Sequence, residues 1–330
     1  MKDLQNKKIL LFTSKFFGYE EMIKAAMEEE GAIVHLYDER NNPTEIEKIL
    51  LRKVHFLMIR KINKYYKMIV DKEIIFNPDY IIFVSPEAVT NSALRYIRKK
   101  FSKSIIILYM WDSIENKNIK NILCYFDECF SFDLSDCEKY NMKFRPLFYS
   151  KEYCIKHEVK DYKYDLCFIG TIHSDRAKIL WELKKYCDKN DISYYFYLYI
   201  PGSFLLLLRK LFTYSLRLWD KEYIHTKPME KEKVAMISAD TRCVIDINHP
   251  KQTGLTMRTI EMLGLKRKIM TTNENVKNYD FYRTENQIII RRNNINIDKR
   301  ALYHSYVDVS DEIYKKYSLE VWIKDIFSIR

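Results

Sequence analysis

Short apolar runs rich in β-branched and aromatic residues alternate along this chain with longer amphipathic stretches. A strand of a parallel sheet is buried on both faces and shows such a continuous apolar run, and its connection to the next parallel strand is usually a helix. The alternation therefore predicts βαβ units and an α/β fold. Because 330 residues exceed one ordinary doubly wound domain, we expect two domains of roughly 150 residues each.

The predicted elements form two βα series joined by a polar, aperiodic linker at residues 144–163. We assign residues 1–150 to a first Rossmann-like domain and 151–310 to a second. Residues 311–330 form a C-terminal part. A helix is predicted at residues 310–328, and by analogy with proteins of this architecture we expect it to cross back to the first domain.

The individual elements follow from apolar periodicity and from glycine and proline positions. Strands are predicted at residues 8–13, 33–37, 80–84, 104–109, 128–130, 164–170, 193–200, 243–248, 268–272 and 287–290. Helices are predicted at residues 19–30, 43–76, 174–189, 231–238 and 256–263. Gly31 is expected to end the first of these helices in a left-handed conformation.

Composition narrows the class of protein. The seven cysteines contain no C-x-x-C pair, which indicates reduced thiols in a cytosolic protein. The polar residues 1–8 and the short apolar run after them predict neither an export signal nor a membrane anchor. The net charge of +11 favours polyanionic partners, which include nucleic acid, anionic lipid and phosphorylated substrates.

The first motif that can carry chemistry is the predicted strand that ends in Gly170 and Thr171. A helix is expected to open at Ser174 or Asp175, with Arg176 in its first turn. Free backbone N–H groups at such a helix start bind anions. A strand–glycine–helix junction is also an ordinary structural feature, and this alternative stays open.

The second motif is the loop and helix start at Thr253, Gly254, Leu255 and Thr256, followed by Arg258. Glycine allows the backbone to approach a phosphate closely, and the start of the helix supplies N–H donors and the positive end of its dipole. The guanidinium of Arg258 matches phosphate oxygens. The motif predicts a diphosphate site.

Glu261 follows on the same predicted helix, five residues beyond Thr256. An ionised carboxylate is an acceptor only, which suits the two hydroxyls of a ribose. The alternative is a surface glutamate on an amphipathic helix.

These motifs resemble the C-terminal domain of GT-B glycosyltransferases, especially the CgeB-like bacterial enzymes that build lipopolysaccharide, capsule or spore-coat glycans. The resemblance covers about residues 164–290, and the first half of the chain matches only in its βα order. It rests on Phe168-Ile-Gly-Thr171 with Arg176, on Gly254-Leu-Thr-Met-Arg-Thr-Ile-Glu261, and on Lys268-Ile-Met-Thr-Thr-Asn273 through to Tyr279.

The resemblance implies two Rossmann-like domains that face each other across a cleft. The nucleotide would lie on the second domain, with Glu261 on the ribose and the loop that starts at Thr253 around the diphosphate. The acceptor would approach from the first domain. Many retaining members carry a second glutamate eight positions before the ribose-binding one, and here that position is Thr253, which departs from the retaining pattern.

The resemblance also implies no metal on the diphosphate and no cofactor other than the donor itself. The sequence lacks an Asp-x-Asp on a loop and a His/Cys cluster with zinc spacing. We interpret Asp133 with Asp136, and Asp308 with Asp311, as solvated carboxylates.

An inverting transfer needs a general base for the acceptor hydroxyl. We select Asp112, because it follows directly on a predicted buried strand, and Trp111 beside it suits the face of a sugar. The alternatives for Asp112 are a helix N-cap or an Asx-turn. Glu20 and Glu21 are secondary candidates.

Residues 203–221 combine bulky apolar residues with four basic ones. The segment is too short and too charged to span a bilayer, but it is typical of helices that lie in a membrane interface. Such a helix would suit a lipid-linked acceptor at the inner leaflet. A helix packed internally or against a partner subunit is the alternative.

We therefore expect a cytoplasmic, metal-independent hexosyltransferase, peripheral at the inner face of the membrane, that transfers sugar from a nucleotide-sugar to a surface polysaccharide or lipid-linked saccharide. The alternatives are a non-catalytic basic nucleic-acid-binding protein and a sugar-nucleotide epimerase of related fold. No recognisable nucleic-acid-binding module is present in the sequence, and a nucleic-acid-binding protein would have no use for Glu261. We therefore expect no nucleic-acid partner.

Overall fold

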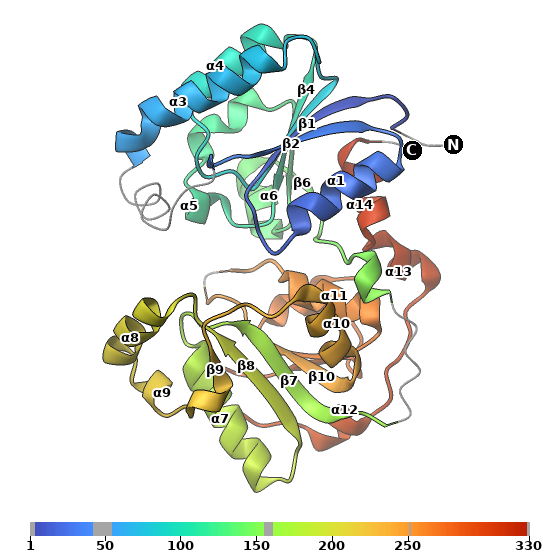
Figure 1. Ribbon diagram of the computed structural model, residues 1–330. Coiled ribbons are helices and arrows are strands. Elements are labelled where there is room, and N and C mark those ends of the chain that lie inside the picture. The colour runs from blue at the N-terminus through green and yellow to red at the C-terminus, as the bar shows by residue number, and fades with distance from the viewer. Residues whose placement is uncertain (1–3, 42–54, 155–160, 251, 329–330) are drawn as a thin grey trace. The chain divides into compact units, whose positions relative to one another are not determined.

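The computed structural model describes residues 4–41, 55–154, 161–250 and 252–328 (Figure 1). The chain divides into two compact units. Unit 1 comprises Met1–Leu147 with Leu319–Arg330, and unit 2 comprises Phe148–Ser318. Each unit is built around its own parallel sheet.

The sheet of unit 1 has six strands in the order β2-β1-β3-β4-β5-β6, and every neighbouring pair is parallel. The strands are β1 (Lys8–Thr13), β2 (Ile33–Asp38), β3 (Tyr80–Val84), β4 (Ile105–Met110), β5 (Glu128–Ser131) and β6 (Lys143–Phe144). Thr13 pairs with Asp38 on one side and with Val84 on the other. The carboxyl ends of these strands therefore meet at one edge of the sheet.

Helices cover both faces of this sheet. They are α1 (Tyr19–Glu29), α3 (His55–Lys72), α4 (Asn91–Lys100), α5 (Ile114–Lys117), α6 (Leu134–Tyr140) and α14 (Leu319–Ile326). Figure 1 shows α3 and α4 on one side and α1 with α14 on the other. The core on the α3–α4 side includes Phe12, Phe83 and Leu94. On the other side, the ring of Trp322 lies 4.7 Å from that of Tyr109.

The sheet of unit 2 also has six parallel strands, in the order β12-β11-β10-β7-β8-β9. The strands are β7 (Tyr164–Thr171), β8 (Tyr194–Tyr199), β9 (Ile224–His225), β10 (Thr241–Asp246), β11 (Lys268–Thr271) and β12 (Gln287–Ile289). Its helices are α7 (Arg176–Lys189), α8 (Ser203–Phe212), α9 (Tyr214–Arg217), α10 (Lys231–Ala239), α11 (Met257–Leu265), α12 (Lys299–Tyr303) and α13 (Asp311–Lys316). Short 3-10 segments are η1 (Lys120–Tyr125) in unit 1 and η2 (Lys151–Tyr153), η3 (Lys221–Tyr223) and η4 (Glu274–Asn278) in unit 2.

The predicted strands are confirmed, with ends that shift by no more than two residues, and Gly31 ends α1 with a φ of 93°. Of the long helix predicted at residues 43–76, the structure shows α3, which ends at Lys72, and residues 43–54 lie outside the described part. The prediction that all of residues 144–163 form a linker is wrong, because part of this segment belongs to the core of unit 2. Phe148, Tyr149 and Tyr153 in it are buried, because they pack into unit 2.

The single C-terminal helix predicted at residues 310–328 is also wrong, because α13 ends and α14 begins around Tyr317 and Ser318. Tyr317 is buried, its hydroxyl donates to Asp280 at 2.6 Å, and its carbonyl accepts from the N–H of Tyr149 at 2.8 Å. These tertiary contacts break the helix. As a result α13 belongs to unit 2 and α14 to unit 1.

Candidate functional site

Arg176 connects two strands at the carboxyl edge of the unit 2 sheet. It is the first residue of α7, its Nη1 donates to the carbonyl of Thr171 at 2.8 Å, and its Nε donates to the carbonyl of Ile247 at 2.7 Å. Burial lowers the pKa of this guanidinium. Arg176 thus holds the ends of β7 and β10 together and brings a positive charge to this edge.

Gly170 leaves space for Arg176. A Cβ at Gly170 would lie 3.2 Å from Cζ of Phe168 and 3.8 Å from Nη1 of Arg176. The first distance is tighter than ordinary van der Waals contact, so a side chain there would press the Phe168 ring against its surroundings. Gly170 therefore serves the packing of this junction, as expected for an ordinary structural strand–glycine–helix junction.

The loop before α11 is held from the carboxyl end of β11. The Nδ2 of Asn273 donates to the carbonyls of Thr253 at 3.0 Å and Gly254 at 3.1 Å. Gly254 and Leu255 are buried, whereas Thr253 is exposed. Nδ2 of Asn275 also donates to the carbonyl of Thr253 at 3.2 Å, so amide side chains that follow β11 fix the loop in place.

Thr256 is the N-cap of α11, and its hydroxyl accepts from the N–H of Thr259. The same hydroxyl donates to Oδ2 of Asp246 at 2.7 Å, and the hydroxyl of Thr259 donates to that oxygen at 2.9 Å. Asp246 is buried at the end of β10. The start of α11, with its N–H groups and positive dipole end, is thus anchored at the carboxyl edge of the sheet.

Glu261 lies inside the protein, with 3% of its surface exposed. Its Oε2 is 3.5 Å from Nη1 of Arg258, and the hydroxyl of Tyr153 hydrogen-bonds to it. The interpretation of Glu261 as a surface glutamate is therefore wrong. A buried carboxylate that is paired with an arginine of the same helix can accept hydrogen bonds from a polar ligand.

Gly264 permits this arrangement, because η2 packs directly on α11. A Cβ at Gly264 would lie 2.7 Å from Cγ of Tyr149 and 2.9 Å from the carbonyl oxygen of Tyr153. No side chain fits at such distances without a shift of the backbone. The absence of a side chain at Gly264 therefore lets Tyr153 reach Glu261.

Sequence reasoning did not identify several cationic residues at the same edge. Arg292 donates through Nη1 to both carboxylate oxygens of Asp175, at 2.8 and 3.0 Å, and through Nη2 to Asn248. Arg209 of α8 donates to the carbonyl of Ile172. A signal for Arg292 was present, because it follows the strand predicted at residues 287–290.

His173 and His249 also lie at this edge, with ring centroids 5.9 Å apart. Burial, together with the positive charge of Arg176 and the nearby His249, lowers the pKa of His173 to about 4, so near pH 7 the arginines and not His173 supply the positive charge. An anion is bound most strongly where several cations lie together at a partly desolvated edge. The edge therefore has the electrostatics and the donors to bind a diphosphate.

Asp112 follows β4 at the carboxyl edge of the unit 1 sheet, and 40% of its side chain is exposed. It accepts from the N–H of Ser113 at 3.2 Å and from Nδ2 of Asn116 at 3.4 Å, and its Oδ2 is 3.6 Å from Nζ of Lys117. Ser113, and not Asp112, is the N-cap of α5, so the N-cap interpretation of Asp112 is wrong. Its carboxylate is partly open to solvent.

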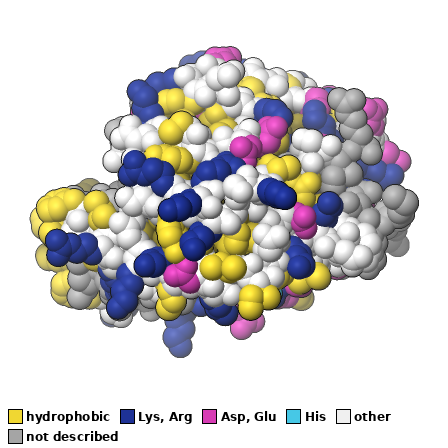
Figure 2. All heavy atoms as spheres, turned by 90° about the horizontal axis from the view of Figure 1, so that it is seen from above, with side chains coloured by type: hydrophobic (Ala, Val, Ile, Leu, Met, Phe, Trp, Pro, Cys, Tyr) yellow, Lys and Arg dark blue, Asp and Glu magenta, His cyan; other side chains and the backbone are white. Residues whose placement is uncertain are grey.

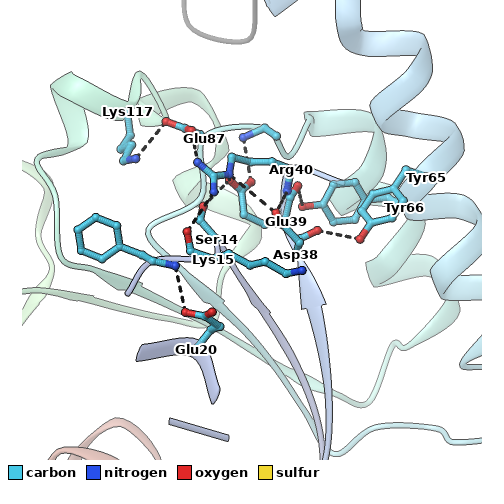
Figure 3. A network of polar contacts seen from close by, with 12 residues as sticks. Ser14, Lys15, Glu20, Asp38, Glu39, Arg40, Tyr65, Tyr66, Glu87 and Lys117 are labelled. Carbon is cyan, nitrogen blue, oxygen red and sulfur yellow. Dashed lines mark hydrogen bonds and ion pairs between the residues drawn. The ribbon is translucent and has the colours of Figure 1, made fainter. Parts of the chain in front are cut away.

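Aromatic rings lie near Asp112. The ring centroid of Trp111 is 6.3 Å from those of Phe16 and Tyr19, and Phe16 is half-exposed. Glu20, one of the secondary candidates for the base, accepts from the N–H of Phe16 at 3.0 Å (Figure 3). Its carboxylate therefore has a structural role at the start of α1.

Lys117, the ion-pair partner of Asp112, also belongs to a larger network at this edge, and Figure 3 shows that network from Lys117 onward. Its Nζ donates to Glu87 at 3.0 Å, and Nη1 of Arg40 donates to Glu87 at 3.2 Å. Glu39 lies at the buried end of the network, where it accepts from the hydroxyl of Ser14 and from the N–H of Ala88. Side chains that follow β1, β2, β3 and β4 thus share one hydrogen-bonded cluster.

Glu39 makes this cluster sensitive to pH. Burial raises its pKa from 4.5 to about 7, and the neighbouring Glu87 adds to the shift. The folded protein therefore binds this proton more tightly than the unfolded chain does, and the stabilisation is complete below pH 4.5 and lost as the pH rises through 7. The loss amounts to about 3 kcal/mol in the free energy of unfolding.

We expect Glu39→Gln to remove this dependence, because glutamine has the shape of the protonated acid and no proton to lose. Urea unfolding between pH 5 and 8 measures the free energy of unfolding of the wild type and of Glu39→Gln. As the pH rises, the wild type should lose stability relative to the variant. The exposed Glu21→Gln on α1 is the control. Parallel curves for wild type and Glu39→Gln would contradict the buried, proton-binding state of Glu39.

Metal ligands do not gather in the part of the chain that the structure describes, where no group of three or more His, Cys, Asp or Glu is placed to hold an ion. The interpretation of Asp133 and Asp136 as solvated is wrong, because both are buried. Asp133 caps α6 through the N–H of Ser135, and Asp136 accepts from the N–H of Ile114 at 2.8 Å. Asp308 and Asp311 lie at the surface, and Asp308 pairs with Lys266.

Basic side chains are spread over the face that Figure 2 shows, among hydrophobic and uncharged ones, and they form no continuous stripe there. Nucleic-acid-binding proteins usually gather such charges on one face or along one helix.

Among the helices of the described residues, none is long and apolar enough to cross a bilayer.

No protein-family model matches the chain, and no curated protein sequence does. Solved structures match it over nearly its whole length. HepE from Anabaena in complex with UDP-glucose has a TM-score of 0.65 and 10% identity, and the match covers 97% of this chain and 98% of that one. The lipopolysaccharide outer core galactosyltransferase WaaB has a TM-score of 0.55 and 12% identity, with 97% and 99% covered.

A UDP-GlcNAc 2-epimerase from Methanocaldococcus jannaschii, in complex with UDP-GlcNAc and UDP, has a TM-score of 0.55 and 13% identity, with 98% and 100% covered. A galactosyltransferase, a protein bound to UDP-glucose and an epimerase are thus all similar in fold to this chain. In fold, the protein is a two-domain α/β chain of the GT-B-like type, with six parallel strands in each sheet.

Proposed function

We propose that this protein is a glycosyltransferase that moves a hexosyl group from a nucleotide-sugar to a surface polysaccharide or a lipid-linked saccharide. The observation that carries the proposal is the buried Glu261, paired with Arg258 in the first turns of α11 at the carboxyl edge of the unit 2 sheet. Ligands of open α/β sheets bind at that edge. The UDP-glucose complex of HepE, a protein of the same fold, supports the choice of donor class.

In this proposal the donor lies on unit 2. The N–H groups at the start of α11 and the guanidinium of Arg258 hold the diphosphate, and Arg176 and Arg292 add positive charge nearby. As the bond to the sugar breaks, negative charge grows on the diphosphate, and fixed donors and cations stabilise it in the transition state. These groups would allow the leaving group to depart without a metal ion.

Glu261 would accept the ribose hydroxyls. A carboxylate that forms an ion pair with Arg258 and accepts from the hydroxyl of Tyr153 is held in one orientation, so little entropy is lost when the ribose binds. Thr253, Gly254, Leu255 and Thr256 would line the phosphates, with Gly170 and Thr171 at the end of β7.

The acceptor would be bound by unit 1, where Asp112 receives the proton of the attacking hydroxyl. Its partly exposed carboxylate and the ion pair with Lys117 fit a base that works from the ionised state. Thr253 stands where retaining relatives carry a glutamate, which favours inversion.

Binding to a panel of nucleoside diphosphates and nucleotide-sugars tests the proposal. A ligand at a hundred times its dissociation constant stabilises the folded state by about 2.7 kcal/mol, which raises the melting temperature by several degrees. We expect at least one nucleotide to do so. Salt-sensitive binding of DNA, with no nucleotide bound, would instead favour the nucleic-acid alternative.

An epimerase is the second candidate, because a UDP-GlcNAc 2-epimerase has the same fold at similar coverage. The two activities differ in their need for an acceptor. Isomerisation of a free nucleotide-sugar without any acceptor would identify an epimerase, whereas transfer that depends on added saccharide would identify a transferase.

A further inference from the structure

The outer face of α8 and α9 is the most apolar exposed surface of unit 2. The large hydrophobic side chains that it exposes are Phe204, Leu207, Leu211, Phe212 and Tyr214. Phe204 is 74% exposed and Phe212 is 86% exposed. Soluble surfaces rarely gather so many large apolar side chains within eleven residues, and such patches mark interaction sites.

The helix uses its two sides differently. Leu205 and Leu206 pack against the core of unit 2, whereas Phe204, Leu207 and Leu211 follow the three- and four-residue spacing of a second, outward face. The exposed face is therefore not needed to fold the helix onto the sheet.

Basic residues accompany this face. Residues 203–221 contain Arg209, Lys210, Arg217 and Lys221, against the single acidic residue Asp220. Arg217 and Lys221 are exposed. An apolar face flanked by an excess of cations matches the interface of an anionic bilayer, where apolar side chains enter the acyl boundary and cations meet the headgroups.

The segment is firmly attached to unit 2. Leu216 and Trp219 are buried, and Nε1 of Trp219 donates to the carbonyl of Ala177 at 3.1 Å. Figure 1 shows α8 and α9 outside the β8–β9 end of the sheet. Arg209 binds the carbonyl of Ile172 beside His173, so the apolar face is carried by the same loop region as the cationic edge.

We propose that the face formed by Phe204, Leu207, Leu211, Phe212 and Tyr214 docks on the surface of an anionic phospholipid bilayer. A second copy of the chain is the less suitable occupant, because two copies of this segment would bring their basic side chains together as like charges. Docking would hold the donor edge of unit 2 near the headgroups, where a lipid-linked saccharide is found. The docking itself does not depend on the proposed transfer reaction.

Co-sedimentation of the full chain with vesicles tests the proposal. We expect binding to vesicles that contain phosphatidylglycerol, weaker binding to pure phosphatidylcholine, and a loss of binding at high salt. Leu211→Ser with Phe212→Ser should lower the partition coefficient about tenfold or more. Both side chains are exposed, so the melting temperature should change little.

Matched controls separate this face from the rest of the surface. Met236→Ser on α10 removes an apolar side chain that is 62% exposed, close to the 58% of Leu211, and should leave vesicle binding unchanged. Lys210→Gln with Lys221→Gln should weaken binding to anionic vesicles about tenfold, whereas Lys233→Gln with Lys277→Gln, which removes the same charge elsewhere on unit 2, should not.

Two results would overturn the proposal. One is equal sedimentation of the wild type and the Leu211→Ser, Phe212→Ser variant, which includes the case that neither binds vesicles. The other is a dimer in solution, measured by sedimentation velocity without lipid, that becomes a monomer in this variant. No nucleotide-sugar is present in these measurements, so either result leaves the transferase proposal to be judged by the nucleotide panel.

Discussion

Glu261→Gln is expected to weaken the binding of nucleoside diphosphates and nucleotide-sugars about tenfold or more, because the amide keeps one acceptor and replaces the other by a donor. A ribose offers two hydroxyls, and a glutamine has a single carbonyl oxygen to accept from them and from its protein partners. Isothermal titration calorimetry with the best ligand of the panel measures the change. The exposed Glu232→Gln on α10 is the control and should bind as the wild type does.

Glu261→Ala should have a further effect on folding. It leaves the guanidinium of Arg258 without its carboxylate partner at a largely buried position, which typically costs about 3–5 kcal/mol. Glutamine also removes this charge but keeps a carbonyl oxygen that can face the guanidinium, so in urea unfolding it should lose less stability than alanine, which leaves no acceptor there. If Glu261→Gln binds nucleotides as tightly as the wild type, the carboxylate does not contact the ribose and the assignment of the donor site is wrong.

Asp112→Asn should reduce kcat by about 10²–10⁴ while the nucleotide affinity stays unchanged, because loss of a general base removes proton transfer and not donor binding. Asparagine retains the acceptor for the N–H of Ser113, so the local fold should persist. Product formation with a saturating donor and acceptor measures kcat, and calorimetry with the donor alone checks binding.

The matched control for Asp112 is Glu115→Gln, three residues along the chain, whose side chain pairs with Lys139 at the surface. Its kcat should stay within about twofold of the wild type if only the carboxylate at Asp112 accepts the proton. A variant Asp112→Asn with normal turnover would exclude Asp112 as the base. Glu87, which shares Lys117 with Asp112, would then be the next carboxylate to substitute.

Both candidate sites are built in the same way. In each unit, loops and helix starts follow parallel strands whose carboxyl ends meet at one edge, and polar side chains accumulate there. In unit 2 the edge carries the cations around Arg176 and the start of α11. In unit 1 it carries the network of Glu39, Glu87 and Lys117 that contacts Asp112.

Much of the fold was predictable from the sequence. The strands at residues 8–13 and 80–84 have the predicted ends, because buried β-branched runs are bounded by polar or proline residues that act over a short range. The C-terminal helix was not predictable in the same way. Its residues have helical periodicity on both sides of Tyr317, and only the contacts of Tyr317 with Asp280 and Tyr149 interrupt it.

The site was predictable in part. The start of α11 was readable because a threonine N-cap, a preceding glycine and an arginine in the first turns are local signals. The burial of Glu261 was not readable, because it depends on the packing of η2 on Gly264, more than a hundred residues away along the chain. The place of Arg209 at this edge was missed for the same reason, whereas Arg292 directly follows a predicted strand and only its pairing with Asp175 depended on the fold.

The sequence by itself determined where strands and helices form and which loops could present donors and charges, since apolar period, glycine, proline and capping residues act within a few positions of the chain. Only the tertiary structure decided which distant side chains share an edge. The order β12-β11-β10-β7-β8-β9 differs from the order along the chain. It brings Arg176, Arg258 and Arg292 to one sheet edge, because parallel strands align their carboxyl ends whatever their separation in sequence.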